Sequence, residues 1–381
     1  MFSMESMSGK IRVLSIFGTR PEATKMVPLI KALVNHSAVE SIVCVTAQHR
    51  ELLDDVLVPL GIVPDYDLNL MRERQSLTEL TARALTELDE VIRKAKPDWI
   101  LVHGDTATTL AASLAAFYNM VKVAHVEAGL RTYNKYQPFP EEINRKVTTA
   151  IADLHFAPTE LAREQLLKEN VPDDTIVVTG NTGIDLMAHT VKEGYVFQEP
   201  AIASLPFDGS KRIILMTAHR RENWGAPLEN ICRAVRRIAD DFQDVVIVYP
   251  VHPNPAVKEV AHGLLSGHDR IVLTEPVSVF DLHNLMNKAY LVLTDSGGIQ
   301  EEAPALDKPV IVMRDVTERS EGEAAGTLIL AGTEGERIYE NVRCLLTDKE
   351  KYRRMAQTPN PFGDGKASGR IVEAIAARRI K

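Results

Sequence analysis

The sequence has few of the residues that mark a metal protein or a disulfide-stabilised one. Its 381 residues include three cysteines, Cys44, Cys232 and Cys344, whose spacing matches no zinc-binding pattern. None of the eleven histidines stands in a His-Glu-x-x-His sequence. We therefore expect no bound metal, and we expect the cysteines to be reduced thiols, as in a cytoplasmic protein.

Long apolar runs are missing as well. No stretch approaches the roughly 20 apolar residues that a transmembrane helix requires, and the first ten residues lack the apolar core of a signal peptide. The net charge of −8 argues against nucleic acid or an anionic membrane as the main partner. An anionic ligand would therefore have to be bound by a local group of basic side chains.

Three common loop motifs of α/β enzymes are also absent from the sequence. There is no Gly-x-Gly-x-x-Gly loop after the first predicted strand, no Walker A loop and no Gly-x-Ser-x-Gly turn. These absences argue against the usual nicotinamide, P-loop and serine-hydrolase sites. We expect no cofactor.

Strand-like and helix-like segments alternate along the chain, and the alternation occurs twice. In the first half, the predicted strands are residues 11–16, 41–46, 99–102, 121–126 and 154–156. In the second half, they are residues 212–216, 245–249, 270–273, 291–294 and 310–313. Because these strands are almost continuously apolar, helices are expected to cover both faces of each sheet. The pattern predicts an α/β protein with two doubly wound parallel sheets.

The length also favours two domains, because 381 residues exceed the usual size of one core. A polar stretch with glycine and proline, residues 192–210, separates the two halves. We place an N-terminal domain at residues 1–190 and a C-terminal domain at residues 191–365. The predicted helix in residues 366–381 is expected to pack back on the N-terminal domain.

The segment after the predicted strand 291–294 is the most informative one for function. Ser296, Gly297 and Gly298 form a turn before a predicted helix, and such a turn lets backbone N–H groups approach an anion closely. Glu302 lies about one turn into that helix. The segment therefore predicts a phosphate at the turn and a sugar or ribose hydroxyl at Glu302.

Basic side chains follow two other predicted strands, at the carboxyl edge where open α/β sheets bind ligands. Arg20 and Lys25 come after the first strand, and His219 comes after strand 212–216, directly before two arginines. These groups are suited to a diphosphate. A turn with solvated charges explains Arg20 and Lys25 equally well.

Carboxylates follow two further strands of the first half. Asp105 comes after strand 99–102, Glu127 comes after strand 121–126, and Glu141 opens a predicted helix. Two such groups can act as acid and base when their surroundings separate their pKa values. The alternatives are structural: Asp105 could be a helix N-cap, and Glu141 could form an intrahelical ion pair with Arg145.

Seven motifs occur in order along the chain. They are FGTRPE (17–22), TAQHR (46–50), VHGDT (102–106), HVEAGLR (125–131), PEE (140–142), AHRRE (218–222) and DSGGIQEE (295–302). As an ordered set they resemble the non-hydrolysing UDP-N-acetylglucosamine 2-epimerases. The resemblance implies the GT-B fold, in which two Rossmann-like domains enclose the active site in the cleft between them. It also implies interconversion of UDP-GlcNAc and UDP-ManNAc without NAD or metal, by a homodimer that supplies ManNAc for cell-surface polysaccharide.

The resemblance also implies roles for individual residues. The expected acid–base group is Asp105, Glu127 and Glu141. Arg145 would orient Glu141, and His219 would stabilise the departing diphosphate. The expected UDP-binding residues are Arg20, Lys25, His219, Val277, Leu282, Ser296, Gly297, Gly298, Glu302 and Arg319. Some relatives bind a second UDP-GlcNAc as an allosteric activator, and the positions expected for it are Gln48, His49 and Arg74.

Three other functions fit part of the same pattern. A GT-B glycosyltransferase that uses a UDP-sugar would share the fold and the nucleotide site, but it needs an acceptor site rather than three carboxylates. An epimerase for a related diacetamido-uronic sugar nucleotide would share the chemistry. A regulator that binds a nucleotide sugar would share the binding site and catalyse nothing.

Overall fold

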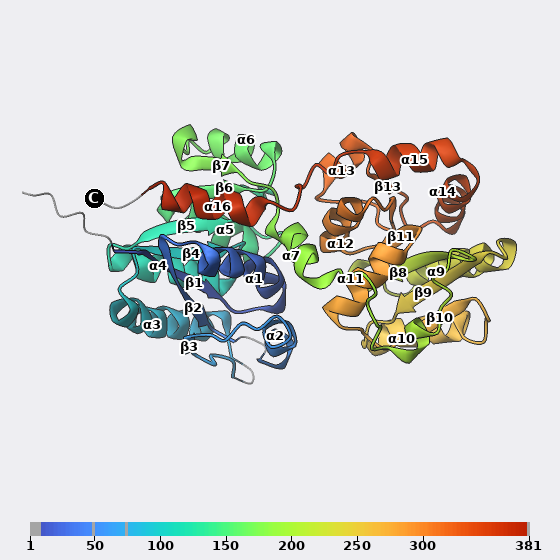
Figure 1. Cartoon of the computed structure of the whole chain (residues 1–381), viewed down its shortest axis with the longest axis horizontal. Coiled ribbons are helices and arrows are strands. Elements are labelled where there is room, and N and C mark those ends of the chain that lie inside the picture. Colours follow the sequence, from blue (N-terminus) through green and yellow to red (C-terminus); the bar gives the residue numbers. More distant parts are fainter. Residues whose placement is uncertain (1–8, 48–49, 73–74, 379–381) are drawn as a thin grey trace, which may run out of the picture. The chain divides into compact units, whose positions relative to one another are not determined.

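The structure is a computed structural model that describes residues 9–47, 50–72 and 75–378 (Figure 1). The chain forms two compact units. Unit 1 consists of the described residues up to Leu186 and those from Gly363 onward, and unit 2 consists of Met187–Phe362. Each unit contains one parallel sheet, so the predicted α/β class with two doubly wound parallel sheets is confirmed.

The sheet of unit 1 has seven strands in the order β3-β2-β1-β4-β5-β6-β7. They are β1 (Ile11–Phe17), β2 (Val39–Val45), β3 (Tyr66–Asp67), β4 (Trp99–His103), β5 (Lys122–Val126), β6 (Leu154–Ala157) and β7 (Ile176–Val178). The strand order reverses between β1 and β4, which are hydrogen-bonded neighbours. The loops that follow these two strands therefore leave the carboxyl edge side by side, at the point where doubly wound sheets bind ligands.

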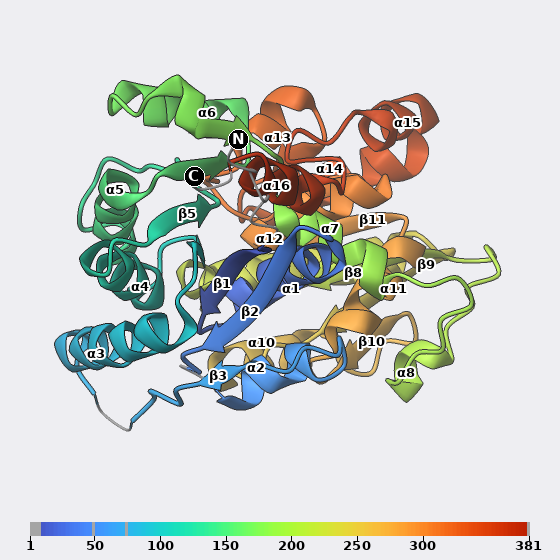
Figure 2. The ribbon, with the colours of Figure 1, turned by 60° about the vertical axis from the view of Figure 1, so that its left-hand side comes forward.

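Helices cover this sheet on both faces (Figure 2). They are α1 (Arg20–Asn35), α2 (Arg50–Leu57), α3 (Leu77–Ala95), α4 (Ala107–Tyr118), α5 (Glu141–Ile151), α6 (Glu160–Lys168), the single turn η1 (Asp173–Thr175) and α16 (Ala367–Ala376). Helices α3, α4 and α5 pack side by side, whereas α1 packs against α2 and α16. A further helix, α7 (Thr182–Thr190), carries the chain from unit 1 into unit 2.

Local sequence explains where two of the long helices begin. Thr19 caps α1 by accepting the N–H of Glu22, whose side chain in turn accepts the N–H of Thr19. Ser76 and Glu79 form the same reciprocal pair at the start of α3. Ser76 is therefore the cap of α3, and the helix proper begins at Leu77.

The last helix, α16, is held in unit 1 by polar contacts. The backbone N–H and the hydroxyl of Ser368 both donate to the carboxylate of Asp185, at 3.2 and 3.3 Å. Burial raises the pKa of Asp185 to about 6, although these hydrogen bonds act in the opposite direction. Arg370 adds a hydrogen bond of 2.9 Å to the carbonyl oxygen of Thr179.

The sheet of unit 2 has six strands in the order β10-β9-β8-β11-β12-β13. They are β8 (Arg212–Thr217), β9 (Val245–Pro250), β10 (Ile271–Thr274), β11 (Leu291–Thr294), β12 (Val310–Val312) and β13 (Leu328–Leu330). The helices are α8 (Pro200–Ala203), α9 (Ala226–Asp241), α10 (Pro255–Leu265), α11 (Val279–Lys288), α12 (Gly297–Glu302), α13 (Ser320–Ala325), α14 (Gly335–Thr347) and α15 (Lys349–Gln357), with the short turns η2 (Arg221–Asn223) and η3 (Ala303–Leu306). Here the order reverses between β8 and β11, so their loops are neighbours.

The sequence prediction missed three short edge strands, β3, β7 and β13. Each has only two or three residues, which is too short to show a strand period. In the described parts of the chain, no helix is long and apolar enough to cross a membrane.

Gly129 allows the loop after β5 to approach α6 closely. Its φ of +95° favours glycine, and a Cβ added there would lie 2.2 Å from the carbonyl oxygen of Ala162. The contact atom is backbone, so it cannot move aside cheaply. Gly61 also has a positive φ, of +70°, but an added Cβ would meet nothing within 4 Å.

We therefore predict that Gly129→Ala lowers the free energy of unfolding by about 3 kcal/mol or more, because it adds a clash to the backbone strain. Gly61→Ala is the matched control, since it adds the strain alone, which costs about 1 to 2 kcal/mol. Urea unfolding followed by circular dichroism measures both. Equal losses in the two variants would contradict the close approach at Gly129.

Candidate active site

Asp105 lies in the loop after β4, next to an arginine from α5. Its carboxylate oxygen Oδ2 accepts hydrogen bonds from Nε of Arg145 at 2.8 Å and lies 2.6 Å from Nη2. The N-cap of α4 is Thr106, not Asp105, which removes the structural alternative for Asp105. Asn144 fixes the same loop by donating to the carbonyl oxygen of Asp105 at 2.8 Å.

Our expectation that Arg145 orients Glu141 is wrong in this structure. Arg145 contacts Asp105 and, at 3.3 Å, the carboxylate of Glu142. The intrahelical pair of Glu141 and Arg145 is not formed either. The physical reason is that the guanidinium of Arg145 can bind two carboxylates at once, those of Asp105 and of the fully buried Glu142.

The two glutamates at the start of α5 have different surroundings. The carboxylate of Glu142 accepts the backbone N–H groups of Thr132 and Tyr133, each at 3.0 Å, so Glu142 holds the preceding loop. The Oε2 atom of Glu141 is buried and has no hydrogen-bond partner among the described residues. An unpartnered carboxylate oxygen at a helix start is available to a ligand's proton.

Glu127 follows β5 in a backbone conformation that glutamate seldom adopts, with φ of +62°. Its carboxylate binds the ammonium group of Lys25 and accepts a hydrogen bond of 3.0 Å from Asn181. The Nε2 atom of His103 lies 3.6 Å away. The strained backbone and the convergent partners indicate a side chain that is held in place for function.

Two buried histidines underlie these loops. Burial lowers the pKa of His103 to about 4 and that of His125 to about 3, so both imidazoles are neutral near pH 7. His125 makes a 2.7 Å hydrogen bond through Nε2 with the carbonyl oxygen of Gly104. The imidazole rings next to the loops of Asp105 and Glu127 therefore carry no charge near pH 7.

The two basic residues of α1 are placed differently. Arg20 is the first residue of the helix, and its side chain makes no hydrogen bond or ion pair within the described part of the chain. Lys25 lies one turn further on and points its charge at Glu127. Lys25 thus belongs to the carboxylate group in this structure, which the sequence pattern did not suggest.

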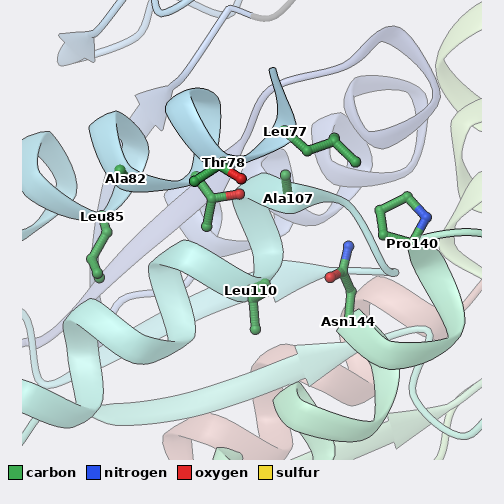
Figure 3. Close-up of a pocket in the computed structure, with 9 residues that line it drawn as sticks. Leu77, Thr78, Ala82, Leu85, Ala107, Leu110, Pro140 and Asn144 are labelled. Atoms are coloured by element: carbon green, nitrogen blue, oxygen red, sulfur yellow. The ribbon is translucent and has the colours of Figure 1, made fainter. Parts of the chain in front are cut away.

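A largely apolar pocket of about 450 Å³ borders the Asp105 loop (Figure 3). Its lining residues are Leu77, Thr78, Thr81, Ala82, Leu85, Ala107, Leu110, Pro140 and Asn144. Asn144 and Pro140 connect it to the site, because Asn144 binds the Asp105 backbone and Pro140 precedes Glu141. None of the lining side chains is ionisable, so the acid–base chemistry is not expected in this pocket.

In unit 2, a buried carboxylate organises the loop that carries His219. The Oδ2 atom of Asp295, after β11, accepts the N–H groups of His219 and Arg220, each at 2.8 Å, and the amide of Asn223 at 3.1 Å. The half-exposed ring of His219 stacks on His252, with ring centres 5.7 Å apart. Burial lowers the pKa of His219, whereas the charge of Asp295 raises it.

The glycines after Ser296 lie beneath an arginine. A Cβ added to Gly297 would be 3.0 Å from the guanidinium carbon of Arg319, so a larger residue there would push Arg319 away from the turn. Arg319 is held there by Glu301, which accepts from its Nε at 2.9 Å. The turn and Arg319 together form a site for an anion.

Glu302, at the end of α12, lies 3.6 Å from Nε2 of the buried His283. The other nitrogen of His283 makes a 2.7 Å hydrogen bond with the hydroxyl of Thr190, which fixes the ring. Val277 and Leu282 are partly buried and pack against the apolar core of unit 2. Their exposed portions leave an apolar surface on the same unit.

Several of these supporting residues were not predicted as site residues. Asp295 and Glu22 occur inside the quoted motifs, but only their burial and backbone contacts reveal their role. Asn181 and His283 stand in segments without any motif, so no signal in the sequence could have identified them. Gln48, His49 and Arg74, expected for an allosteric site, lie outside the described residues. Within the described ranges, no group of three or more His, Cys, Asp or Glu side chains is arranged to hold a metal ion.

Two parallel sheets with polar loops at their order reversals place the chain among two-domain Rossmann-like proteins. A family model described as UDP-N-acetylglucosamine 2-epimerase matches residues 31–376. The UDP-N-acetylglucosamine 2-epimerase of Bacillus subtilis is 56% identical over 366 residues, which cover 96% of this chain and 95% of the relative. The chain therefore belongs to the UDP-N-acetylglucosamine 2-epimerase family.

Solved structures agree with this assignment. The complex of S. aureus MnaA with UDP has a TM-score of 0.85 and 53% identity, and the match covers 96% of both chains. The UDP-GlcNAc 2-epimerase of Neisseria meningitidis, bound to UDP-GlcNAc, has a TM-score of 0.86 and 47% identity, and the match covers 97% of this chain and all of that one. The fold of the two units is of the GT-B type.

The buried histidines give a prediction on stability and pH. In the folded protein His125 stays neutral down to a pKa of about 3, whereas an unfolded chain binds a proton near pH 6.5. The unfolded state therefore binds more protons between these values, and the free energy of unfolding falls as the pH is lowered. At pH 5 the contribution of His125 is about −2 kcal/mol relative to pH 7.

We predict that His125→Gln, which does not titrate, flattens the decrease in unfolding free energy between pH 7 and 5. Gln retains an N–H that can donate to Gly104. The matched control is His36→Gln, at a histidine of unit 1 whose side chain is 24% exposed. Urea unfolding at a series of pH values measures the slopes. A slope in His125→Gln equal to that of the control would contradict the buried neutral imidazole.

Proposed function

We propose that this protein interconverts UDP-GlcNAc and UDP-ManNAc. The proposal is supported by three carboxylates of unit 1: Asp105 and Glu127 follow the paired strands β4 and β5, and Glu141 opens α5, whose Arg145 binds Asp105. Inverting one carbon needs a base on one face of the sugar and an acid on the other. A glycosyltransferase needs at most one base, so the additional carboxylates favour the epimerase.

In the proposed mechanism, UDP leaves C1 as the C2 proton is removed, which gives 2-acetamidoglucal and bound UDP. The proton at C2 is too weakly acidic to be taken directly, so departure of UDP must assist its removal. A proton then adds to C2 from the opposite face, and UDP returns to C1. The reaction balances because one carboxylate takes the C2 proton, another group donates a proton to the opposite face of C2, and UDP returns to C1.

We propose that unit 2 binds UDP. The N–H groups at Ser296, Gly297 and Gly298, together with Arg319, suit the diphosphate, because they combine a helix start with a fixed guanidinium. Glu302, oriented by His283, is placed to accept from ribose hydroxyls. The proposal draws support from the S. aureus relative, whose solved structure is a complex with UDP. Val277 and Leu282 would pack against uracil.

We propose that His219 and Arg20 stabilise the departing diphosphate. The backbone of His219 is fixed by Asp295, and Arg20 has no protein partner among the described residues. A half-exposed imidazole beside a fixed loop can donate to a phosphate oxygen as negative charge develops there. Lys25, which binds Glu127, would interact electrostatically with both the proposed base and the departing diphosphate.

The proposal predicts exchange of the C2 hydrogen. In D₂O, without NAD or metal, UDP-GlcNAc should give UDP-ManNAc that carries deuterium at C2. Proton NMR of the reaction mixture measures this product and its deuterium content. Asp105→Asn, Glu127→Gln and Glu141→Gln should each lower the rate by roughly 100-fold or more, the effect of removing an acid–base group. Glu160→Gln is the matched control for Glu141, since each glutamate is the first residue of its helix.

Other outcomes would assign the alternatives. Release of UDP only after an acceptor is added would indicate a glycosyltransferase. Epimerisation of a diacetamido-uronic sugar nucleotide, with UDP-GlcNAc unchanged, would indicate the related epimerase. Binding of UDP-GlcNAc with no product would indicate a regulator.

We also propose a homodimer in the cytoplasm. At the end of α4, the apolar side chains of Phe117, Tyr118 and Met120 are 57, 65 and 90% exposed, as expected of a surface that another chain covers. Cys44 and Cys232 are buried, unpaired thiols, as in a reducing compartment. Sedimentation equilibrium at twice the chain mass would support the dimer, and a single-chain mass would contradict it.

Activation by a second UDP-GlcNAc remains part of the proposal, at Gln48, His49 and Arg74. It requires a sigmoidal dependence of the forward rate on UDP-GlcNAc. A hyperbolic forward curve, together with full reverse activity from UDP-ManNAc alone, would contradict it.

A further inference from the structure

Glu22 is a buried carboxylate that joins two strand-end loops. Its side chain is 2% exposed. The Oε2 atom accepts the backbone N–H of Gly18 at 3.0 Å, the N–H of Thr19 at 2.8 Å and the hydroxyl of Thr19 at 2.8 Å. The Oε1 atom accepts the hydroxyl of Thr106 at 2.8 Å. One side chain of α1 therefore connects the loop after β1 to the loop after β4.

The residues at the two ends of this connection adjoin proposed site residues. Gly18 and Thr19 precede Arg20, and we call residues 18–20 the Arg20 loop. Thr106 follows Asp105 directly and caps α4, and we call residues 104–106 the Asp105 loop. A displacement of Thr106 would therefore move Asp105 relative to Arg20.

Helix capping alone does not explain this arrangement. Glu79 forms the same capping box with Ser76 at the start of α3, but it lies on the surface and its hydrogen bonds go only to Ser76. A buried carboxylate is costly unless its hydrogen bonds are satisfied. Burial raises the pKa of Glu22, and the donors from Thr106, Gly18 and Thr19 oppose that shift. The capping box of Glu79 and Ser76 shows no counterpart to the hydrogen bond between Glu22 and Thr106, which joins the loops after two neighbouring strands.

We infer that Glu22, through Thr106, is a positioning residue that sets the spacing between the Arg20 loop and the Asp105 loop. The inference rests on the proposed function, in which Arg20 faces the leaving diphosphate and Asp105 handles a proton. Leaving-group departure and proton transfer occur together in that mechanism, so their separation must be fixed. A misplacement of about 1 Å can cost a factor of about 100 in rate.

The test removes the bridge from the side of Thr106. Thr106→Val keeps the shape of the side chain but lacks the hydroxyl, and Thr106→Ser restores it. Because Thr106 also caps α4, the matched control is Thr159→Val, which removes the N-cap of α6 in the same unit. Steady-state kinetics and amide hydrogen exchange are measured on all four full-length proteins, wild type included.

We expect Thr106→Val to lower kcat by roughly 10- to 100-fold with KM changed no more than about twofold, because alignment rather than binding is lost. Thr106→Ser should recover most of kcat, and Thr159→Val should stay within about twofold of wild type. The amides of residues 18–20 and 22 should exchange faster in Thr106→Val only.

Equal kcat values in Thr106→Val and Thr159→Val would overturn the inference while leaving the epimerase proposal intact. Unchanged exchange at residues 18–20 and 22 in Thr106→Val would overturn it whether or not the wild type is active. An inactive wild type would instead overturn the proposed function, and the positioning role with it. Should Thr106→Val fail to fold, Glu22→Ala tests the bridge from the other end, with faster exchange at residues 104–109 as the expected result.

Discussion

In each unit, a buried carboxylate accepts hydrogen bonds from strand-end loops and so fixes their positions. In unit 1, Glu22 binds the N–H groups of Gly18 and Thr19 and the hydroxyl of Thr106. In unit 2, Asp295 binds the N–H groups of His219 and Arg220. Both carboxylates lie where the strand order reverses. Charged acceptors make strong hydrogen bonds in a dry environment, so each loop is fixed before a ligand arrives.

The carboxylates proposed for catalysis are held differently from one another. Asp105 pairs with Arg145, and Glu127 pairs with Lys25 and Asn181, whereas one oxygen of Glu141 is buried without a partner among the described residues. Acid and base roles require groups whose environments differ. The neutral rings of His103 and His125 beneath the loops add no competing charge.

The sequence was sufficient to predict two doubly wound parallel sheets, because nearly continuous apolar strands are a local signal. It did not reveal the edge strands β3, β7 and β13, which are too short to show a repeating pattern of apolar side chains. The partner of Arg145 was predicted wrongly, because helical spacing suggested Glu141. Its contacts with Asp105 and Glu142 depend instead on burial and on a loop 40 residues away in the chain. Supporting residues such as Asn181 and His283 act through tertiary contacts that no motif encodes.

In the proposed mechanism, the bond between C1 and the diphosphate oxygen breaks during epimerisation. UDP-GlcNAc labelled with ¹⁸O in that bridging position tests it most directly, with ³¹P NMR following the label. If UDP departs, rotation of its terminal phosphate lets the label move into non-bridging positions while the substrate is converted. Conversion to UDP-ManNAc with the label retained entirely in the bridge would contradict the account.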